Sequence, residues 1–388
     1  MGGMSRVVIA SDKFKGTLTA AQVAAHVAAG LSRAGVHGAE IARVPVADGG
    51  DGTAEAAVAA GFRRVEAKVR GPAGVPVTAA FGLLDGTAVI EAAQACGLSL
   101  LPAGSLAPLT ATSYGVGELI LTAVRMGATR AVLGLGGVAT TDGGAGLVQA
   151  LGARLTDVSG AEVPPGGAAL AQLCTLDLSG MHDLAGVEFL VASDVDNPLL
   201  GPSGAATVYG PQKGASVSDV PVLEAGLARW ADVAEEAVGA SSLPAGAPRP
   251  AVRDAVGAGA AGGLGFAALL FLHARMRPGI SLLLDMVSFS RYLDGARLVI
   301  TGEGSLDAQS LHGKAPVGVA RAAAAHHPAV PVVAVAGVCT LRPDQLREAG
   351  IAAAYALTDI EPDVARCCAN PGPLLERLAA RIAEDWLR

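Results

Sequence analysis

The sequence predicts an α/β protein whose parallel sheet is formed from the two ends of the chain and interrupted by an inserted α/β domain. Three observations lead to this prediction. Short β-branched runs alternate with helical segments at the N-terminus, the same alternation returns near the C-terminus, and the middle has strands of its own. At 388 residues the chain is long enough for about two or three domains.

The first unit of this pattern lies within residues 1–66. A β-branched strand at 7–10 leads through the loop 11–16 into an amphipathic helix that begins near Thr17 or Thr19. Val23, Val27 and Leu31 share one face of that helix, and Gly35 is a natural C-terminal stop. A second strand at 41–46 precedes the loop 47–53 and another alanine-rich helix, which completes a β-α-β-α order.

The far end of the chain repeats the alternation. Short buried-looking strands are predicted at 297–301, 332–336 and 352–357. We therefore assign 1–66 and 290–388 to one discontinuous domain, and 67–289 to the inserted domain. The inserted domain has predicted strands at 87–90, 130–135 and 188–192.

Composition excludes several classes of protein. The chain has 28 Lys plus Arg and 35 Asp plus Glu, which gives a net charge of −7. It contains no run of basic residues, and this argues against nucleic acid as a partner. The five cysteines match neither a disulfide framework nor a zinc site. Residues 255–272 are uncharged, but their many glycines favour buried interior over a membrane helix. We expect a cytoplasmic protein with no membrane partner, either a monomer or a homodimer.

Acid-rich or glycine-rich loops follow nearly every predicted strand. Because ligands bind beyond the carboxyl ends of parallel strands, these loops predict one composite site. Each loop alone is more often an ordinary turn, and Asp12 or Asp142 can serve merely as a helix cap. The loops are SDKFKG (11–16), ADGGDGT (47–53), GLGGVATTDGGAG (134–146), SDVDNP (193–198) and TGEGSLDAQ (301–309).

The residue types in these loops indicate phosphoryl transfer. Lys13 and Lys15 precede a helix N-terminus, which favours an anion, and the glycines of 134–146 let backbone amides approach phosphate closely. Carboxylates are the hard oxygen donors that hold Mg2+ together with substrate phosphates. The carboxylates in question are Asp194, Asp196, Glu303 and Asp307.

One glycine motif suggests a different chemistry. Residues 257–262, GAGAAG, satisfy GxGxxG, and Asp285 lies at the distance that a dinucleotide-binding motif requires. The preceding RPAVRDAV is a poor buried strand, so a tightly packed helix start is favoured. An NAD-linked hydroxy-acid oxidoreductase is kept as a less favoured alternative.

The chain resembles the bacterial glycerate kinase family, of the type found in glyoxylate and glucarate breakdown. The resemblance runs along nearly the whole chain in seven ordered blocks. They are SDKFKGTL (11–18), PVADGGDGT (45–53), GLGGVATTDGGAGLVQALGA (134–153), SDVDNPLLG (193–201), YGPQKGA (209–215), GAGAAGGLG (257–265) and ITGEGSLDAQSLHGKAPVGVA (300–320).

This resemblance implies a Rossmann-like α/β domain interrupted by a second α/β domain, with the site in the cleft between them. It also implies ATP-dependent phosphorylation of D-glycerate with Mg2+, most often to 2-phosphoglycerate. Val138, Thr141, Ser305 and Ser11 depart from the residues common in the family, but none of these changes removes a carboxylate or a lysine.

With this resemblance, roles are assigned to individual residues as hypotheses. Asp194 and Asp196 place Mg2+ and accept the hydroxyl proton, and Lys213 reaches the phosphates. Lys13, Lys15, Asp48 and Asp51 bind substrate, while Glu303 and Asp307 form a second metal-binding or hydroxyl-binding pair. The predicted phosphate contacts are Gly136, Gly137, Thr140, Asp142, Gly143, Gly144 and Lys314. A kinase for another small hydroxy acid and a non-catalytic binding protein remain alternatives.

Overall fold

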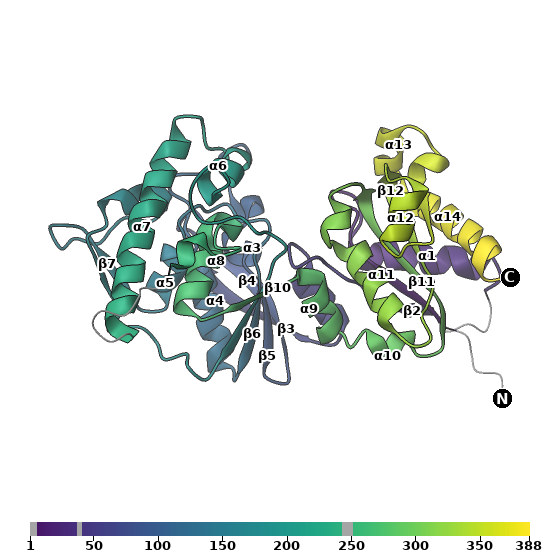
Figure 1. Ribbon diagram of the computed structural model, residues 1–388, viewed down its shortest axis with the longest axis horizontal. Helices are drawn as coiled ribbons and strands as arrows, with labels where there is room; N and C mark the ends of the chain where they lie inside the picture. Colours follow the sequence, from purple (N-terminus) through teal and green to yellow (C-terminus); the bar gives the residue numbers. More distant parts are fainter. Residues whose placement is uncertain (1–5, 37–40, 243–250) are drawn as a thin grey trace. The chain divides into compact units, whose positions relative to one another are not determined.

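The computed structural model describes residues 6–36, 41–242 and 251–388, and the chain divides into two compact α/β units (Figure 1). The first unit comprises Met1–Phe62 with Pro278–Arg388, and the second comprises Arg63–Arg277. The boundaries between the units, after Phe62 and before Pro278, lie earlier in the chain than the boundaries at 66/67 and 289/290 that were predicted from sequence. The reason is that strand β3 (Arg63–Arg70) pairs within the second sheet, whereas helix α9 (Gly279–Met286) packs in the core of the first unit.

The first unit has a fully parallel sheet of five strands in the order β13-β12-β11-β1-β2. The central pair joins the two ends of the chain, with Ser11 of β1 opposite Gly302 of β11. This confirms that the N-terminal and C-terminal segments share one sheet. The strands are β1 (Arg6–Ser11), β2 (Ile41–Arg43), β11 (Ala296–Leu306), β12 (Val332–Cys339) and β13 (Ala353–Ala356).

Helices cover both faces of this sheet. Since side chains alternate along a strand, Val7 and Ile9 enter one core while Val8 and Ala10 enter the other. Helices α1 and α14 cover the first face, and α9 and α11 cover the second. The helices are α1 (Ala20–Arg33), α2 (Thr53–Ala59), α9, α10 (Ser290–Leu293), α11 (Ala315–Ala325), α12 (Pro343–Glu348), α13 (Val364–Ala369) and α14 (Pro371–Trp386).

The start of α1 confirms the prediction made from sequence. Thr19 is the N-cap residue, its hydroxyl accepts from the Gln22 amide at 3.2 Å, and the Gln22 side chain accepts from the Thr19 amide at 2.9 Å. This reciprocal arrangement satisfies two of the free amides at the helix start. Asp12 is therefore not the cap of this helix, and its carboxylate must be explained in another way.

The second unit has a mixed sheet of six strands in the order β10-β9-β6-β5-β4-β3. Its β3-β4-β5 portion is antiparallel, and the β5-β6-β9-β10 portion is parallel. The strands are β3, β4 (Pro76–Leu84), β5 (Thr87–Glu91), β6 (Arg130–Gly134), β9 (Glu188–Ala192) and β10 (Arg275–Arg277), with a separate ribbon of β7 (Arg154–Thr156) and β8 (Thr175–Asp177).

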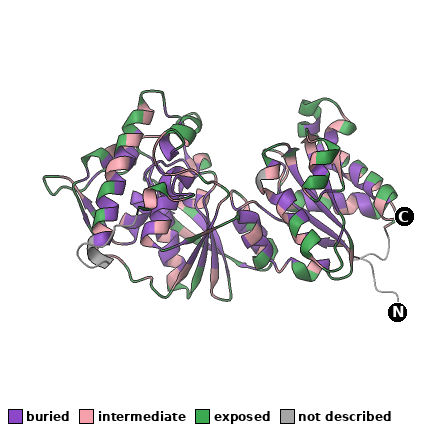
Figure 2. Cartoon of the chain, viewed as in Figure 1, coloured by how far each residue is buried: buried purple, intermediate pink, exposed green. Residues whose placement is uncertain are grey.

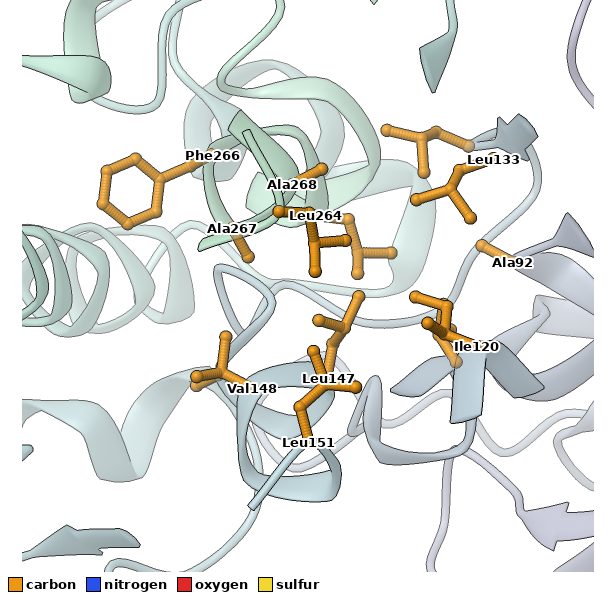
Figure 3. Close-up of a cluster of buried hydrophobic side chains, with 14 of the residues drawn as sticks. Ala92, Ile120, Leu133, Leu147, Val148, Leu151, Leu264, Phe266, Ala267 and Ala268 are labelled. Carbon is orange, nitrogen blue, oxygen red and sulfur yellow. The ribbon is translucent and has the colours of Figure 1, made fainter. Parts of the chain in front are cut away.

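Alanine, valine and leucine build the core of the second unit. Side chains of α5 (Ala145–Ala150) and α8 (Ala260–Phe271), such as Leu147 and Leu264, lie in one buried cluster (Figure 3). The strands of the sheets are likewise largely buried (Figure 2). The other helices of this unit are α3 (Ala93–Cys96), α4 (Tyr114–Arg125), α6 (Ala205–Tyr209) and α7 (Asp219–Ser242).

The uncharged segment 255–272 folds into buried interior, as predicted. Helix α8 occupies Ala260–Phe271, and most of its residues are buried. A short 3-10 turn, Val252–Asp254, stands before it where a dinucleotide-binding motif requires a strand. Throughout the described ranges, no helix combines the length and the apolar character needed to cross a membrane.

Candidate active site

Three carboxylates gather at the carboxyl ends of strands in the first unit. Asp12 directly follows β1, and its amide donates to the Gly302 carbonyl of β11 at 2.9 Å, which places it beside Glu303. Asp12 and Glu303 are each only 8% exposed. Asp48 follows β2, and its carboxylate accepts from the Gly50 amide at 3.1 Å. Three of the five predicted loops, 11–16, 47–53 and 301–309, thus lie at this end of the first sheet, while the loops 134–146 and 193–198 belong to the second unit.

The electrostatics show that these three groups act on one another. Burial raises the pKa of Asp12 to about 7, and the charges of Asp48 and Glu303 act in the same direction against the opposing effect of Lys13. Burial likewise raises the pKa of Glu303, and Asp48 again contributes. Burial and mutual repulsion therefore both disfavour the charged forms of Asp12 and Glu303.

Lysines border this carboxylate cluster. The Lys13 ammonium lies 3.2 Å from the Asp51 carboxylate and also donates to the Asp51 carbonyl. Lys314 precedes α11, and its charge lowers the pKa of Glu303, while Asp307 raises it. The structure thus groups six predicted site residues with Asp12, for which the sequence suggested only a capping role. Lys15 is exposed in the same loop as Lys13.

The pKa of Asp12 gives a testable pH dependence. A carboxyl group whose folded pKa lies near 7 keeps its proton where the unfolded chain has lost it, so the free energy of unfolding falls as pH rises from about 4 to 7. In the wild type, the free energy of unfolding should fall by up to about 4 kcal/mol over this pH range, and Asp12→Asn should abolish that fall. Thermal unfolding at pH 5 and pH 8 measures it, with the exposed Asp183→Asn as the control. Parallel pH profiles for the wild type and Asp12→Asn would contradict the expectation.

In the second unit, the loop between β6 and α5 is held tightly by its own hydrogen bonds. The buried Asp142 carboxylate accepts from the Ser113 amide at 2.8 Å, the Ser113 hydroxyl at 2.9 Å and the Gly144 amide at 3.0 Å. It also accepts from the Gly146 amide at 3.3 Å, and the Gly143 amide donates to the Gly262 carbonyl at 2.9 Å. A phosphate bound to the Gly143 or Gly144 amide would have to displace these bonds, whereas Gly136 and Gly137 lie in the more exposed part of the loop.

Lys213 lies beneath this loop rather than on the surface. Its ammonium donates to the Thr140 carbonyl at 2.6 Å, and the residue is 3% exposed. Burial lowers the pKa of Lys213 to about 8, while Cys96 and Asp142 act to raise it. The predicted cation is thus close to the predicted glycine loop.

The acid pair Asp194 and Asp196 follows β9 and is exposed. Burial raises the pKa of Tyr209, and the charge of Asp196 adds to that effect. The Tyr209 hydroxyl donates to the Asn197 side chain at 2.7 Å, and Asn197 in turn donates to the Ser203 carbonyl at the same distance. These bonds fix the turn that carries both carboxylates.

The predicted metal ligands divide between the units. Asp194 and Asp196 belong to the second unit, and Glu303 and Asp307 to the first. Within the residues that the structure describes, no three His, Cys, Asp or Glu side chains are grouped as a metal site. The donor chemistry nevertheless fits Mg2+, since all four are carboxylates and the buried Oε1 of Glu303 has no hydrogen-bond partner among the described residues.

Carboxylates, lysines and glycine-rich loops at the ends of parallel strands are typical of α/β enzymes that transfer phosphoryl groups to small molecules. Comparison with known proteins agrees with this class. The model of the glycerate kinase family matches residues 7–387. The chain therefore belongs to the glycerate kinase family.

Individual relatives support this assignment over the full length of the chain. A glycerate kinase of Bacillus subtilis (strain 168) is 44% identical over 382 residues, which cover 97% of each chain. A glycerate 2-kinase of Escherichia coli (strain K12) is 43% identical over 357 residues, covering 91% of this chain and 90% of that one. A crystal structure described as a glycerate kinase 2 from Salmonella typhimurium LT2 superimposes with a TM-score of 0.83 at 37% identity, covering 99% of this chain and 98% of that one.

Proposed function

We propose that this protein uses ATP to phosphorylate D-glycerate on its 2-hydroxyl, giving 2-phosphoglycerate and ADP. The observation that carries the proposal is the cluster of mutually acting carboxylates Asp12, Asp48 and Glu303 beside lysines at the strand ends of the first unit. Such a cluster suits a small ligand that has hydroxyl groups and an acidic group. The similarity to a protein named glycerate 2-kinase supports the choice of hydroxyl.

The first unit would bind the acceptor. Lys13 and Lys15, in the loop after β1, would attract the glycerate carboxylate, and Asp48 and Asp51 would border the bound substrate. Lys314 precedes the N-terminus of α11, where an anionic group is favoured, and it is the phosphate-binding candidate of this unit.

The second unit would supply the groups that act on the phosphates. Gly136, Gly137 and Lys213 are the proposed phosphate contacts, and Asp142 and Thr140 hold the loop in shape. The exposed Asp194 and Asp196 are the proposed Mg2+ ligands and the acceptor of the proton that the hydroxyl loses as its oxygen bonds to phosphorus. Bound Mg2+ neutralises charge on the phosphates.

The proposal is tested by a coupled assay of purified protein with D-glycerate, ATP and Mg2+, with the product identified by NMR. Formation of 2-phosphoglycerate is the expected result. Formation of 3-phosphoglycerate would retain the family and overturn the proposed acceptor. Absence of any ATP-dependent product would favour a different hydroxy acid as the substrate.

Lys213 offers a direct test of phosphate neutralisation. We expect Lys213→Met to lower kcat/KM about 100-fold, because a charge that stabilises the transferring phosphoryl group is lost. The exposed Lys68 of β3 provides the matched control, and Lys68→Met should leave kcat/KM unchanged. Equal activity of the two variants would show that Lys213 only supports the Thr140 loop.

A further inference from the structure

Glu303 has one oxygen that the protein leaves unsatisfied. Its residue is 8% exposed, and its Oε1 atom has no hydrogen-bond partner within the described part of the chain. A hydrogen bond from the Ser310 side chain lowers the pKa of Glu303 and so favours its charged form. A buried carboxylate oxygen without a donor costs free energy, so a ligand that brings a donor to this oxygen would recover that cost.

Asp12 is the neighbour of Glu303 at the end of the sheet. The pairing of Ser11 with Gly302 brings the next residues, Asp12 and Glu303, side by side at the ends of β1 and β11. The Asp12 carboxylate accepts a bond from the Lys13 amide at 2.6 Å. Two neighbouring buried carboxylates therefore face the same site, and both have a pKa raised by burial and by the negative charges around them.

The character of a ligand for this pair follows from the surrounding charges. A ligand carboxylate would be repelled by Asp12 and Glu303, but attracted to Lys13 and Lys314 nearby. Hydroxyl groups donate hydrogen bonds without adding charge, and they suit a site in which lysines already supply the cations. D-glycerate, which has an anionic end and hydroxyl groups on adjacent carbons, matches this character.

We propose that Asp12 and Glu303 bind the adjacent hydroxyl groups of the acceptor and thereby select a dihydroxy acid over a monohydroxy acid. This inference rests on the proposed function and adds Asp12 as a residue that touches the substrate. A site built to receive two hydroxyl groups discriminates strongly against an analogue that lacks one, because a buried acceptor then stays unpaired.

The test measures calorimetric Kd values for three acids with the wild type, Glu303→Gln and Asp12→Asn. The acids are D-glycerate, D-lactate, which lacks the 3-hydroxyl, and 3-hydroxypropionate, which lacks the 2-hydroxyl. Each variant is expected to weaken D-glycerate about 10-fold or more, while leaving one of the two analogues within about 2-fold of its wild-type Kd. The exposed Asp344→Asn, in α12 of the same unit, is the matched control and should change none of the three.

Each outcome has a defined meaning. Equal weakening of all three acids would assign Asp12 and Glu303 a structural role and overturn the inference, as would unchanged binding of D-glycerate. Turnover of D-glycerate with ATP by the wild type is measured separately. Selective loss of D-glycerate binding without any wild-type turnover would uphold hydroxyl recognition and reject the kinase, so the two failures are distinguishable. Thermal unfolding of both variants verifies that they fold.

Discussion

Asp142→Ala is expected to lower the free energy of unfolding of the second unit by about 4 kcal/mol, because each buried donor left unpaired costs about 1–3 kcal/mol. The carboxylate accepts from four donors, two on Ser113 and the amides of Gly144 and Gly146. Losing them should also release the β6-α5 loop and reduce any activity that depends on its shape.

The chain contains a matched control for this experiment. Asp157 accepts from the Ser159 amide at 2.8 Å, the Ser159 hydroxyl at 2.7 Å and the Ala161 amide at 3.0 Å, but those groups are exposed to solvent. Water replaces the lost acceptor there, so Asp157→Ala should cost less than about 1 kcal/mol.

The readout can be specific to the second unit. The chain has two tryptophans, and Trp230 donates its indole N–H to the Gly143 carbonyl at 2.9 Å within the β6-α5 loop. In a Trp386→Phe background, the fluorescence of Trp230 follows unfolding of this unit in urea. Similar losses in Asp142→Ala and Asp157→Ala would contradict the role assigned to the buried carboxylate.

Gly262→Ala is expected to destabilise the second unit by more than about 3 kcal/mol and to abolish activity, because it adds a clash to a strained backbone. Gly262 has a φ of +71°, and a Cβ atom there would lie 2.2 Å from the Thr140 carbonyl oxygen and 2.7 Å from the Lys213 ammonium. The substitution would therefore displace the loop and its buried cation together.

Gly160→Ala separates the two parts of this effect. Gly160 has a comparable φ of +82°, but no atom lies within 4 Å of the position that its Cβ would occupy. Only the unfavourable positive φ of the alanine then contributes, and we expect Gly160→Ala to lower the free energy of unfolding by about 1 kcal/mol. Urea unfolding followed by Trp230 fluorescence compares them, and equal costs would show that the close approach of Gly262 to Thr140 is easily relaxed.

Sequence periodicity predicted the buried strands well and the half-exposed ones poorly. The apolar runs around Val8, Val132 and Val191 correspond to β1, β6 and β9, because strands buried on both faces carry continuous apolar residues. Strand β3, RRVEAKVR, was not predicted, since only Val65 and Val69 of its residues are buried. The strand predicted at 41–46 ends at Arg43 as β2, although the Val44 and Val46 amides still bond to β1.

The sequence predicted which loops follow the ends of strands, but not the contacts within those loops. The positions of the loops followed from the ends of parallel strands. The partners of the loop residues are distant in sequence, since Asp142 bonds to Ser113 across 29 positions and Lys213 to Thr140 across 73. No local pattern encodes such pairings. For the same reason the sequence does not show that Thr19, rather than Asp12, caps α1, or that Asp12 lies beside Glu303.

The pairing of β1 with β11 has a consequence for how the protein is made. Strand β1 leaves the ribosome before the second unit, yet its partner β11 begins only at Ala296, after the whole of the second unit has been synthesised. The second unit can therefore collapse around its own core while Arg6–Ser11 still lacks β11. Closing that long loop makes the first sheet the slower one to assemble, so the carboxylates carried by β1 and β11 come together only late in biosynthesis.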